Sequence, residues 1–375
     1  MLARFYPSPL KWSRCKLRPC GYLSRRAPCL NLLQRVEFRS NWAVNHSTGE
    51  YTSHLVSPTG IAADPELTSH GVDQSKQLAV RLLEVDPPIE RVYSSPFYRC
   101  LQTIEPFVSQ RSNLVGKSGH KGKDLMIRAE PGVGEWFGSA PFEHPTSAAI
   151  EVLKPMFPAI DISYEPIIRP TRTGESLAEL HDRVAATMQE IISQCDRDGI
   201  RAIVICTHAA VVIALGRVLT GAMPDSVDVE DFSAFTCGLS TYRRRTTGES
   251  FAADSNNNKR NSGELGAARE PAEANSLQAS TTTPQAASLT LPSGQGGGVA
   301  VRAWKGCGVT GGWDCTSNSD CSHLAAGEER GWRFSGDEAF DGSVEKSYDA
   351  GIGLGVVVEG KGTKGSRPTG TNSRL

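Results

Sequence analysis

Val204-Ile205-Cys206-Thr207-His208-Ala209-Ala210 is the stretch of this chain that decides its fold. Its β-branched run predicts a buried strand over 200–206. A polar pair ends that strand, and small residues open a helix over 209–220 that Gly221 closes. The His208 imidazole is thereby placed at the carboxyl end of the strand. Free backbone N–H groups of the new helix face the same point, which predicts an anion-binding site.

A second strand-to-helix junction delivers an arginine to the same region. Ser94-Ser95-Pro96-Phe97-Tyr98-Arg99 follows a predicted strand over 91–95 and opens a predicted helix over 96–109. Proline suits the first helical turn, where its missing N–H has no partner to lose. A histidine, an arginine and two helix N-termini that converge on one sheet edge predict a phosphate pocket.

Helices and strands alternate along residues 35–243. The remaining predicted elements are helices over 72–83 and 177–195 and strands over 125–130 and 235–243. Strands and helices in this order predict an α/β domain. We expect a mixed, mostly parallel sheet with helices on both faces.

Residues 1–34 form an atypical segment without Asp or Glu. Their Arg, Ser and Cys content resembles a mitochondrial transit peptide, and a misassigned first exon explains the same composition. Residues 11–34 lack the clean β-branched strand that should lie in the middle of the sheet, and offer only Leu30, Leu32 and Leu33.

The chain beyond residue 243 changes composition sharply. Ser, Asn, Gly, Ala, Thr, Gln and Glu dominate residues 244–298, which predicts a disordered linker. Aromatic residues return over 299–359, where we expect a small separate β-domain. Residues 360–375 are expected to form a flexible tail.

The composition excludes several classes of function. Lys and Arg number 40 against 41 Asp and Glu, a net charge of −1, so direct reading of nucleic acid is not expected. No apolar run approaches the length of a membrane span, and no membrane partner is expected. The 10 cysteines form no CxxC pair, and Cys307, Cys315 and Cys321 match no familiar zinc spacing. We therefore expect reduced thiols, no metal and no cofactor.

Five motifs, taken in order, resemble those of the histidine phosphatase superfamily, also called phosphoglycerate mutase-like. They are Leu67-Thr68-x-x-Gly71-x-x-Gln74, Ser94-Ser95-Pro96-Phe97-x-Arg99-x-x-Gln102-Thr103, Gly134-Glu135-Trp136-Phe137, Gly174-Glu175-Ser176 and Thr207-His208-Ala209. The resemblance implies that Arg99 binds phosphate, that His208 is the second histidine of the pocket and that Glu135 is the proton donor. In this family a first histidine attacks phosphorus and carries the phosphoryl group.

The chain departs from the family at that first histidine. The family carries Arg-His-Gly at the end of its first strand, and the corresponding residues here are Arg35-Val36-Glu37. The resemblance implies that Arg35 and Arg39 bind or border the phosphate. Valine cannot be phosphorylated, and Glu37 would set a carboxylate against a phosphate. Either a splice-model error, which we favour, or a true loss of catalysis explains the change.

Two functions stay open at this stage. A second resemblance, carried by Gly312-Trp313-Asp314-Cys315 and Gly327-Glu328-Glu329-Arg330-Gly331-Trp332-x-Phe334, is to the β-module of tau-class subunits of transcription factor IIIC. It implies a subunit in RNA polymerase III transcription that meets other factor IIIC subunits through this module. A nuclear or cytoplasmic location is then favoured over a mitochondrial one. The alternative is an active phosphomonoesterase whose true N-terminus restores the histidine; the sequence does not separate phosphatase from mutase or name a substrate.

Overall fold

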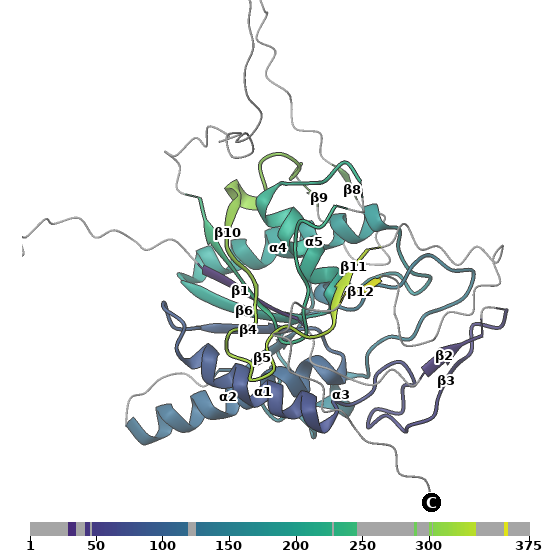
Figure 1. The fold of residues 1–375 in the computed structure, drawn as a ribbon, viewed down its shortest axis with the longest axis horizontal. Helices are drawn as coiled ribbons and strands as arrows, with labels where there is room; N and C mark the ends of the chain where they lie inside the picture. The colour runs from purple at the N-terminus through teal and green to yellow at the C-terminus, as the bar shows by residue number, and fades with distance from the viewer. Residues whose placement is uncertain are drawn as a thin grey trace, which may run out of the picture.

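The computed structural model centres on a six-stranded sheet (Figure 1). It describes residues 29–34, 42–45, 47–118, 125–226, 229–245, 289–290, 300–301, 303–334 and 356–358. The strands of the sheet are β1 (Cys29–Gln34), β4 (Arg91–Ser94), β5 (Ile127–Ala129), β6 (Ala202–Thr207), β7 (Leu239–Arg244) and β10 (Trp313–Asp320).

The spatial order of these strands is β10-β7-β1-β6-β4-β5. β1, β6, β4 and β5 are parallel to one another. Only β7 runs the other way, antiparallel to both β1 and β10. The predicted α/β class with a mixed, mostly parallel sheet is therefore confirmed.

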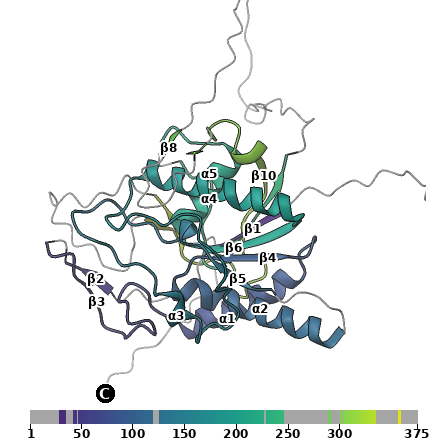
Figure 2. The same cartoon turned by 180° about the vertical axis from the view of Figure 1, so that it is seen from behind.

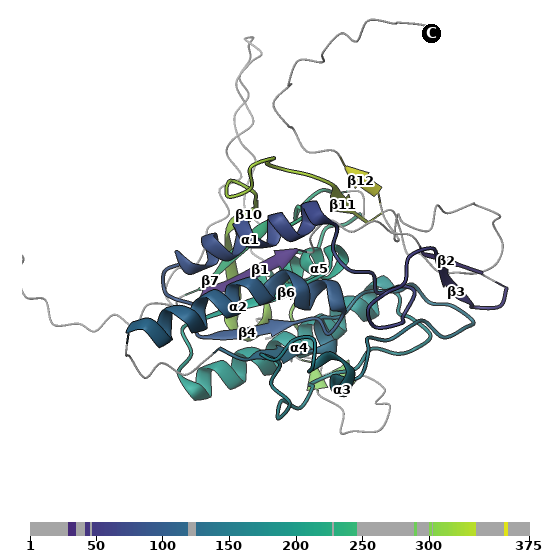
Figure 3. The same ribbon diagram turned by 90° about the horizontal axis from the view of Figure 1, so that it is seen from below.

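Two pairs of helices cover the two faces of the sheet (Figures 1 and 3). They are α1 (Ser69–Leu83) and α2 (Tyr98–Ser118) on one face and α4 (Leu177–Asp198) and α5 (Ala209–Thr220) on the other. Strand β6 serves both sides, since Ile203 and Ile205 join the core of α4 and α5 whereas Val204 and Cys206 join that of α1 and α2. The period of two along a strand explains this division.

The smaller elements lie outside this frame. They are β2 (Trp42–Val44), β3 (Tyr51–Ser53), η1 (Pro131–Val133), α3 (Ile150–Leu153), β8 (Leu289–Thr290), β9 (Ala300–Val301), η2 (Val309–Gly311), β11 (Gly331–Arg333) and β12 (Val356–Val358). The β2–β3 hairpin lies at the periphery in both Figure 1 and Figure 2. Among the described residues, no helix combines the length and apolarity that crossing a membrane requires.

Capping residues explain where the helices α4 and α5 begin and end. Ser176 and Glu179 form a reciprocal capping box at the start of α4. Gly221 ends α5 with a φ of 81°, so the predicted C-cap is confirmed. Helix α2 runs to Ser118, past the expected end at 109, with Pro106 inside it.

The sequence before residue 35 has no clean β-branched strand, yet the structure has a strand there. Residues Cys29–Gln34 form β1, which lies between β6 and β7 and pairs with both. A strand with neighbours on each side is specified by its partners as well as by its own β-propensity. The α/β domain therefore begins before residue 35.

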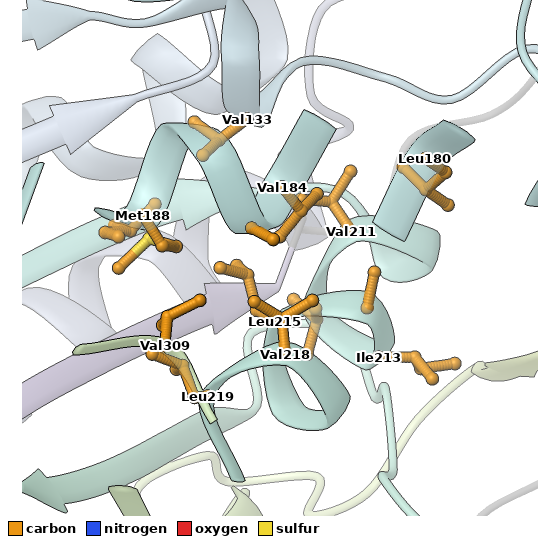
Figure 4. Close-up of a cluster of buried hydrophobic side chains, with 14 of the residues drawn as sticks. Val133, Leu180, Val184, Met188, Val211, Ile213, Leu215, Val218, Leu219 and Val309 are labelled. Carbon is orange, nitrogen blue, oxygen red and sulfur yellow. The ribbon is translucent and has the colours of Figure 1, made fainter. Parts of the chain in front are cut away.

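The structure also differs from the expected separate C-terminal β-domain. β10 pairs with β7 and becomes the edge strand of the main sheet. Trp304, Val309, Trp313 and Phe334 belong to the core under α4 and α5. Figure 4 shows Val309 among side chains of those helices. Residues 303–334 thus complete the α/β domain.

Three predicted divisions lie wholly or mostly outside the described residues. They are residues 1–28 of the N-terminal segment, nearly all of the linker 244–298 and the tail 360–375. The linker and the tail stay predictions.

Candidate functional site

The site lies where β4 and β6 end and α2 and α5 begin. Ser95 and Arg99 follow β4, and His208 is the N-cap residue of α5. The last residue of β1, Gln34, pairs with Thr207, the residue before His208. The carboxyl ends of three parallel strands therefore meet at His208. Arg35 and Arg39, predicted to bind or border phosphate, lie outside the described residues.

His208 is fully buried and held on both ring nitrogens. Its Nε2 lies 2.7 Å from the Ser95 hydroxyl, and its Nδ1 lies 3.0 Å from Glu135 Oε2. The ring also packs edge-on against Phe97, with centroids 5.4 Å apart. These contacts fix one orientation of the imidazole.

Arg99 lies between two carboxylates. Its Nη1 lies 3.2 Å from Asp64 Oδ1, and its Nη2 lies 2.7 Å from Glu135 Oε2. The same Nη2 is 3.3 Å from His208 Nδ1. The guanidinium carbon lies 4.7 Å from the centre of the Phe97 ring. A nearly fully buried arginine therefore points its donors at the place that Glu135 and His208 share.

The electrostatics of the site favour the positively charged forms of His208 and Arg99. Burial opposes the imidazolium of His208, but Cys100 and Glu135 outweigh it and raise the pKa of His208. For Arg99 burial is likewise outweighed, chiefly by Glu135 and Asp64, and its pKa rises. Burial raises the pKa of Asp64 despite the nearby guanidinium of Arg99. Two positively charged groups facing one point suit an anion.

A set of buried hydrogen bonds holds in place the loop that carries Glu135. Arg183 Nε donates to both carboxylate oxygens of Glu175, at 2.8 and 2.9 Å. Its Nη1 donates to the carbonyl of Gly132 at 2.9 Å. Trp136 Nε1 donates to the Glu175 carbonyl at 3.0 Å. The Gly174-Glu175-Ser176 motif therefore supports the Glu135 loop.

A glycine is required at position 174. Its φ is +82°, and a Cβ there would lie 2.1 Å from the carbonyl oxygen of Gly138. The loop after Glu135 and the start of α4 therefore approach each other closely only because residue 174 has no side chain.

The structure brings together Arg99, Glu135 and His208, which the sequence motifs had singled out separately. It adds Asp64, Ser95 and Phe97, to which sequence reasoning gave no role. Ser95 and Phe97 belong to the motif at residues 94–103, and their position in that motif was the only signal for them in the sequence. Asp64 carried no such signal, because its contact with Arg99 crosses from a loop to α2. Within the described part of the chain, no group of three or more His, Cys, Asp or Glu side chains could hold a metal ion.

Comparison with known proteins agrees with this geometry. The family model for the histidine phosphatase superfamily (branch 1) matches residues 49–257. The transcription factor tau 55 kDa subunit of Saccharomyces cerevisiae is 33% identical over 195 residues, which is 50% of this chain and 40% of that protein. The ecdysteroid-phosphate phosphatase of Drosophila melanogaster is 30% identical over 172 residues, 46% of this chain and 22% of that protein. This chain thus matches less than half the length of either relative.

A solved structure is also similar. The ecdysone phosphate phosphatase from Bombix mori, in complex with tungstate, aligns with a TM-score of 0.41 and 19% identity, covering 58% of this chain and 89% of that chain. The predicted resemblances to the superfamily and to a tau-class subunit are both confirmed as similarities.

Proposed function

This chain belongs to the histidine phosphatase superfamily (branch 1), and on that basis we propose that its site binds the phosphoryl group of a phosphomonoester. The observation that carries the proposal is the convergence of Arg99 Nη2 and His208 Nδ1 on one carboxylate oxygen, at 2.7 and 3.0 Å. A phosphoryl oxygen has the charge and the acceptor geometry to take that position.

Glu135 then has a second role. When phosphate occupies the position between Arg99 and His208, the Glu135 carboxyl moves off Arg99 and stands beside the ester oxygen. There it can protonate the leaving group as a general acid. Asp64 remains behind Arg99 and keeps the guanidinium oriented.

We propose that the chain as written binds phosphate but turns over almost none. Val36 and Glu37 stand where the family has its nucleophile and the following glycine. Removing a nucleophile leaves only the acceleration that binding and electrostatics supply. If the true N-terminus carries Arg-His-Gly, the same pocket makes the protein an active phosphomonoesterase.

The test restores the tripeptide by the double substitution Val36→His and Glu37→Gly. We expect phosphate release from p-nitrophenyl phosphate to rise by at least about a hundredfold, because histidine supplies the covalent step. The matched control is Val36→Ala with Glu37→Gly, which removes the carboxylate without adding a nucleophile. A folded, restored variant no more active than this control, and without tungstate binding, contradicts the proposed function.

We propose, second, that the protein is a subunit of a transcription factor IIIC-type assembly in the nucleus. The 33% identity to the yeast tau 55 kDa subunit over 50% of this chain favours it. Because residues 303–334 are part of the α/β domain, the full chain is the form to test. Affinity purification of the tagged full chain is expected to recover other factor IIIC subunits, and a folded chain that recovers none contradicts this second proposal.

A further inference from the structure

Ser95 is a buried hydroxyl at the centre of the site with no assigned role. It follows β4 directly and has no exposed surface. Its backbone N–H donates to the Cys206 carbonyl at 2.8 Å, which ties the end of β4 to β6. Its Oγ lies 2.7 Å from Nε2 of His208. This is a direct contact with one of the two nitrogens on which the charge of His208 depends.

The partners of His208 determine which nitrogen titrates. An ionised carboxylate accepts hydrogen bonds and cannot donate them, so Glu135 at 3.0 Å keeps a proton on Nδ1. Arg99 Nη2, at 3.3 Å from Nδ1, carries only donors and does not replace Glu135 as the partner of Nδ1–H. The proton that His208 gains or loses is therefore the one on Nε2, the nitrogen that faces Ser95.

A hydroxyl can form a hydrogen bond with a histidine nitrogen in both protonation states of the ring. It can accept from Nε2–H when His208 is charged, and it can rotate to donate to Nε2 when His208 is neutral. The other group near Nε2 is Cys100, whose Sγ is 3.6 Å away. Burial raises the pKa of Cys100, but bonds to Cys206 and His208 and the charges of His208 and Arg99 outweigh it and hold that pKa well below its ordinary value. This sulfur therefore accepts from Nε2–H of the charged ring alongside Ser95. The remaining charged groups that face the ring are Arg99, Glu135 and Asp64.

We propose that Ser95 is a positioning residue for His208: its hydroxyl holds Nε2 in both protonation states and so keeps Nδ1–H aimed at the phosphate position beside Arg99. The inference rests on the proposed function only in naming phosphate as the occupant of that position. The hydrogen bonds that carry it are contacts among residues of the chain itself.

A purely structural role for Ser95 is less well supported. The Oγ is 3.4 Å from the backbone nitrogen of Phe97, a long distance for a cap at the start of α2. The neighbouring hydroxyl of Ser94 donates to the Ser95 carbonyl at 2.9 Å and holds this turn. The backbone bond from Ser95 to Cys206 does not involve the side chain.

The test is an NMR titration of the His208 ring nitrogens in the wild type and in Ser95→Ala. A hydrogen bond to a charged group contributes enough that its loss should lower the proton affinity of His208 about tenfold to a hundredfold. Ser95→Thr keeps the hydroxyl and should titrate as the wild type does. Ser94→Ala is the matched control at the neighbouring serine and should leave the titration unchanged.

A Ser95→Ala protein that titrates like the wild type overturns the inference. The wild type alone gives an independent check, should that variant not fold. Above its pKa, neutral His208 must carry its proton on Nδ1, and a spectrum with the proton on Nε2 overturns the inference equally.

Tungstate binding separates this inference from the proposed function. Ser95→Ala is expected to bind tungstate about tenfold more weakly at a pH where wild-type His208 is charged and His208 of the variant is neutral. If the wild type binds no tungstate, the proposed function fails, whereas the titration still decides the role of Ser95.

Discussion

Arg99 is the residue on which the site depends, and its surroundings explain how its charge is accommodated in the protein interior. A buried guanidinium needs compensating charge, and Asp64 and Glu135 supply it from two different loops. Asp64 is buried, whereas Glu135 is partly exposed at 17% of its side-chain surface. Under the proposed function, the more exposed of the two is the one that an anion displaces.

This arrangement predicts opposite effects of Glu135→Gln on binding and on turnover. Tungstate should bind about tenfold more tightly, because a neutral amide no longer competes with the anion for Arg99 and His208. In the Val36→His, Glu37→Gly background, phosphate release should fall by about a hundredfold or more, because the general acid is lost. Calorimetric titration and a phosphate-release assay measure the two quantities. Unchanged or weaker tungstate binding would show that Glu135 does not occupy the anion position.

Among individual residues, His208 and Arg99 could be predicted from the sequence, whereas Ser95, which follows β4 directly, was given no role. His208 and Arg99 follow β6 and β4, and the end of a parallel strand fixes where such a side chain lies. Asp64 could not be found in this way, because its place depends on a tertiary contact between a loop and α2. The supporting role of Glu175 was equally hidden, since its partner Arg183 lies on α4.

Among the elements, amphipathic helices and buried β-branched strands were predictable, and β1 and β10 were not. β10 reads Trp-Asp-Cys-Thr-Ser-Asn-Ser-Asp, with little apolar alternation. It forms a strand because β7 offers it an edge, and its register shifts twice along that edge. β1 has three leucines and no β-branched residue, and its place is determined by β6 and β7.

The integration of β10 predicts a global effect of Trp313→Ala. Trp313 is 1% exposed in the core shared with α4 and α5. Removing a buried tryptophan side chain typically costs ~3–5 kcal/mol, so the free energy of unfolding of the whole domain should fall by about that much. Urea denaturation followed by far-UV circular dichroism measures it.

Thr316→Ala, an exposed position on the same strand, is the matched control and should change stability by no more than ~0.5 kcal/mol. A second, separate unfolding transition that alone responds to Trp313→Ala would mean that residues 303–334 do not belong to the domain.

On the scale of the whole molecule, His181 joins the α/β core to the C-terminal segment. Its ring stacks on Trp304 at 5.9 Å between centroids, and its Nδ1 donates to the Leu177 carbonyl at 2.6 Å. Its buried Nε2 has no hydrogen-bond partner among the described residues. Burial lowers the pKa of His181 to about 4 from its ordinary value of 6.5.

Stability should therefore fall on acidification through this histidine. The unfolded chain takes up the proton near pH 6.5 and the folded chain only near pH 4, so the stabilisation present at pH 7 is lost as pH falls between these values. The loss amounts to about 3 kcal/mol. Urea denaturation at several pH values measures it, and His181→Phe, which keeps an aromatic ring against Trp304, should flatten that dependence. An equal slope in both proteins would exclude His181 as its source.

The pairing of β10 with β7 also imposes an order of events during protein synthesis. Every described residue of the proposed phosphate site has been translated once residue 208 is made, yet the edge of β7 stays uncovered until residues 313–320 leave the ribosome. An open strand edge is a template for pairing with another chain. Premature termination between residues 245 and 313 would yield a product with all its pocket side chains and an unprotected sheet. We expect such a product to collect in aggregates and to be cleared by quality control.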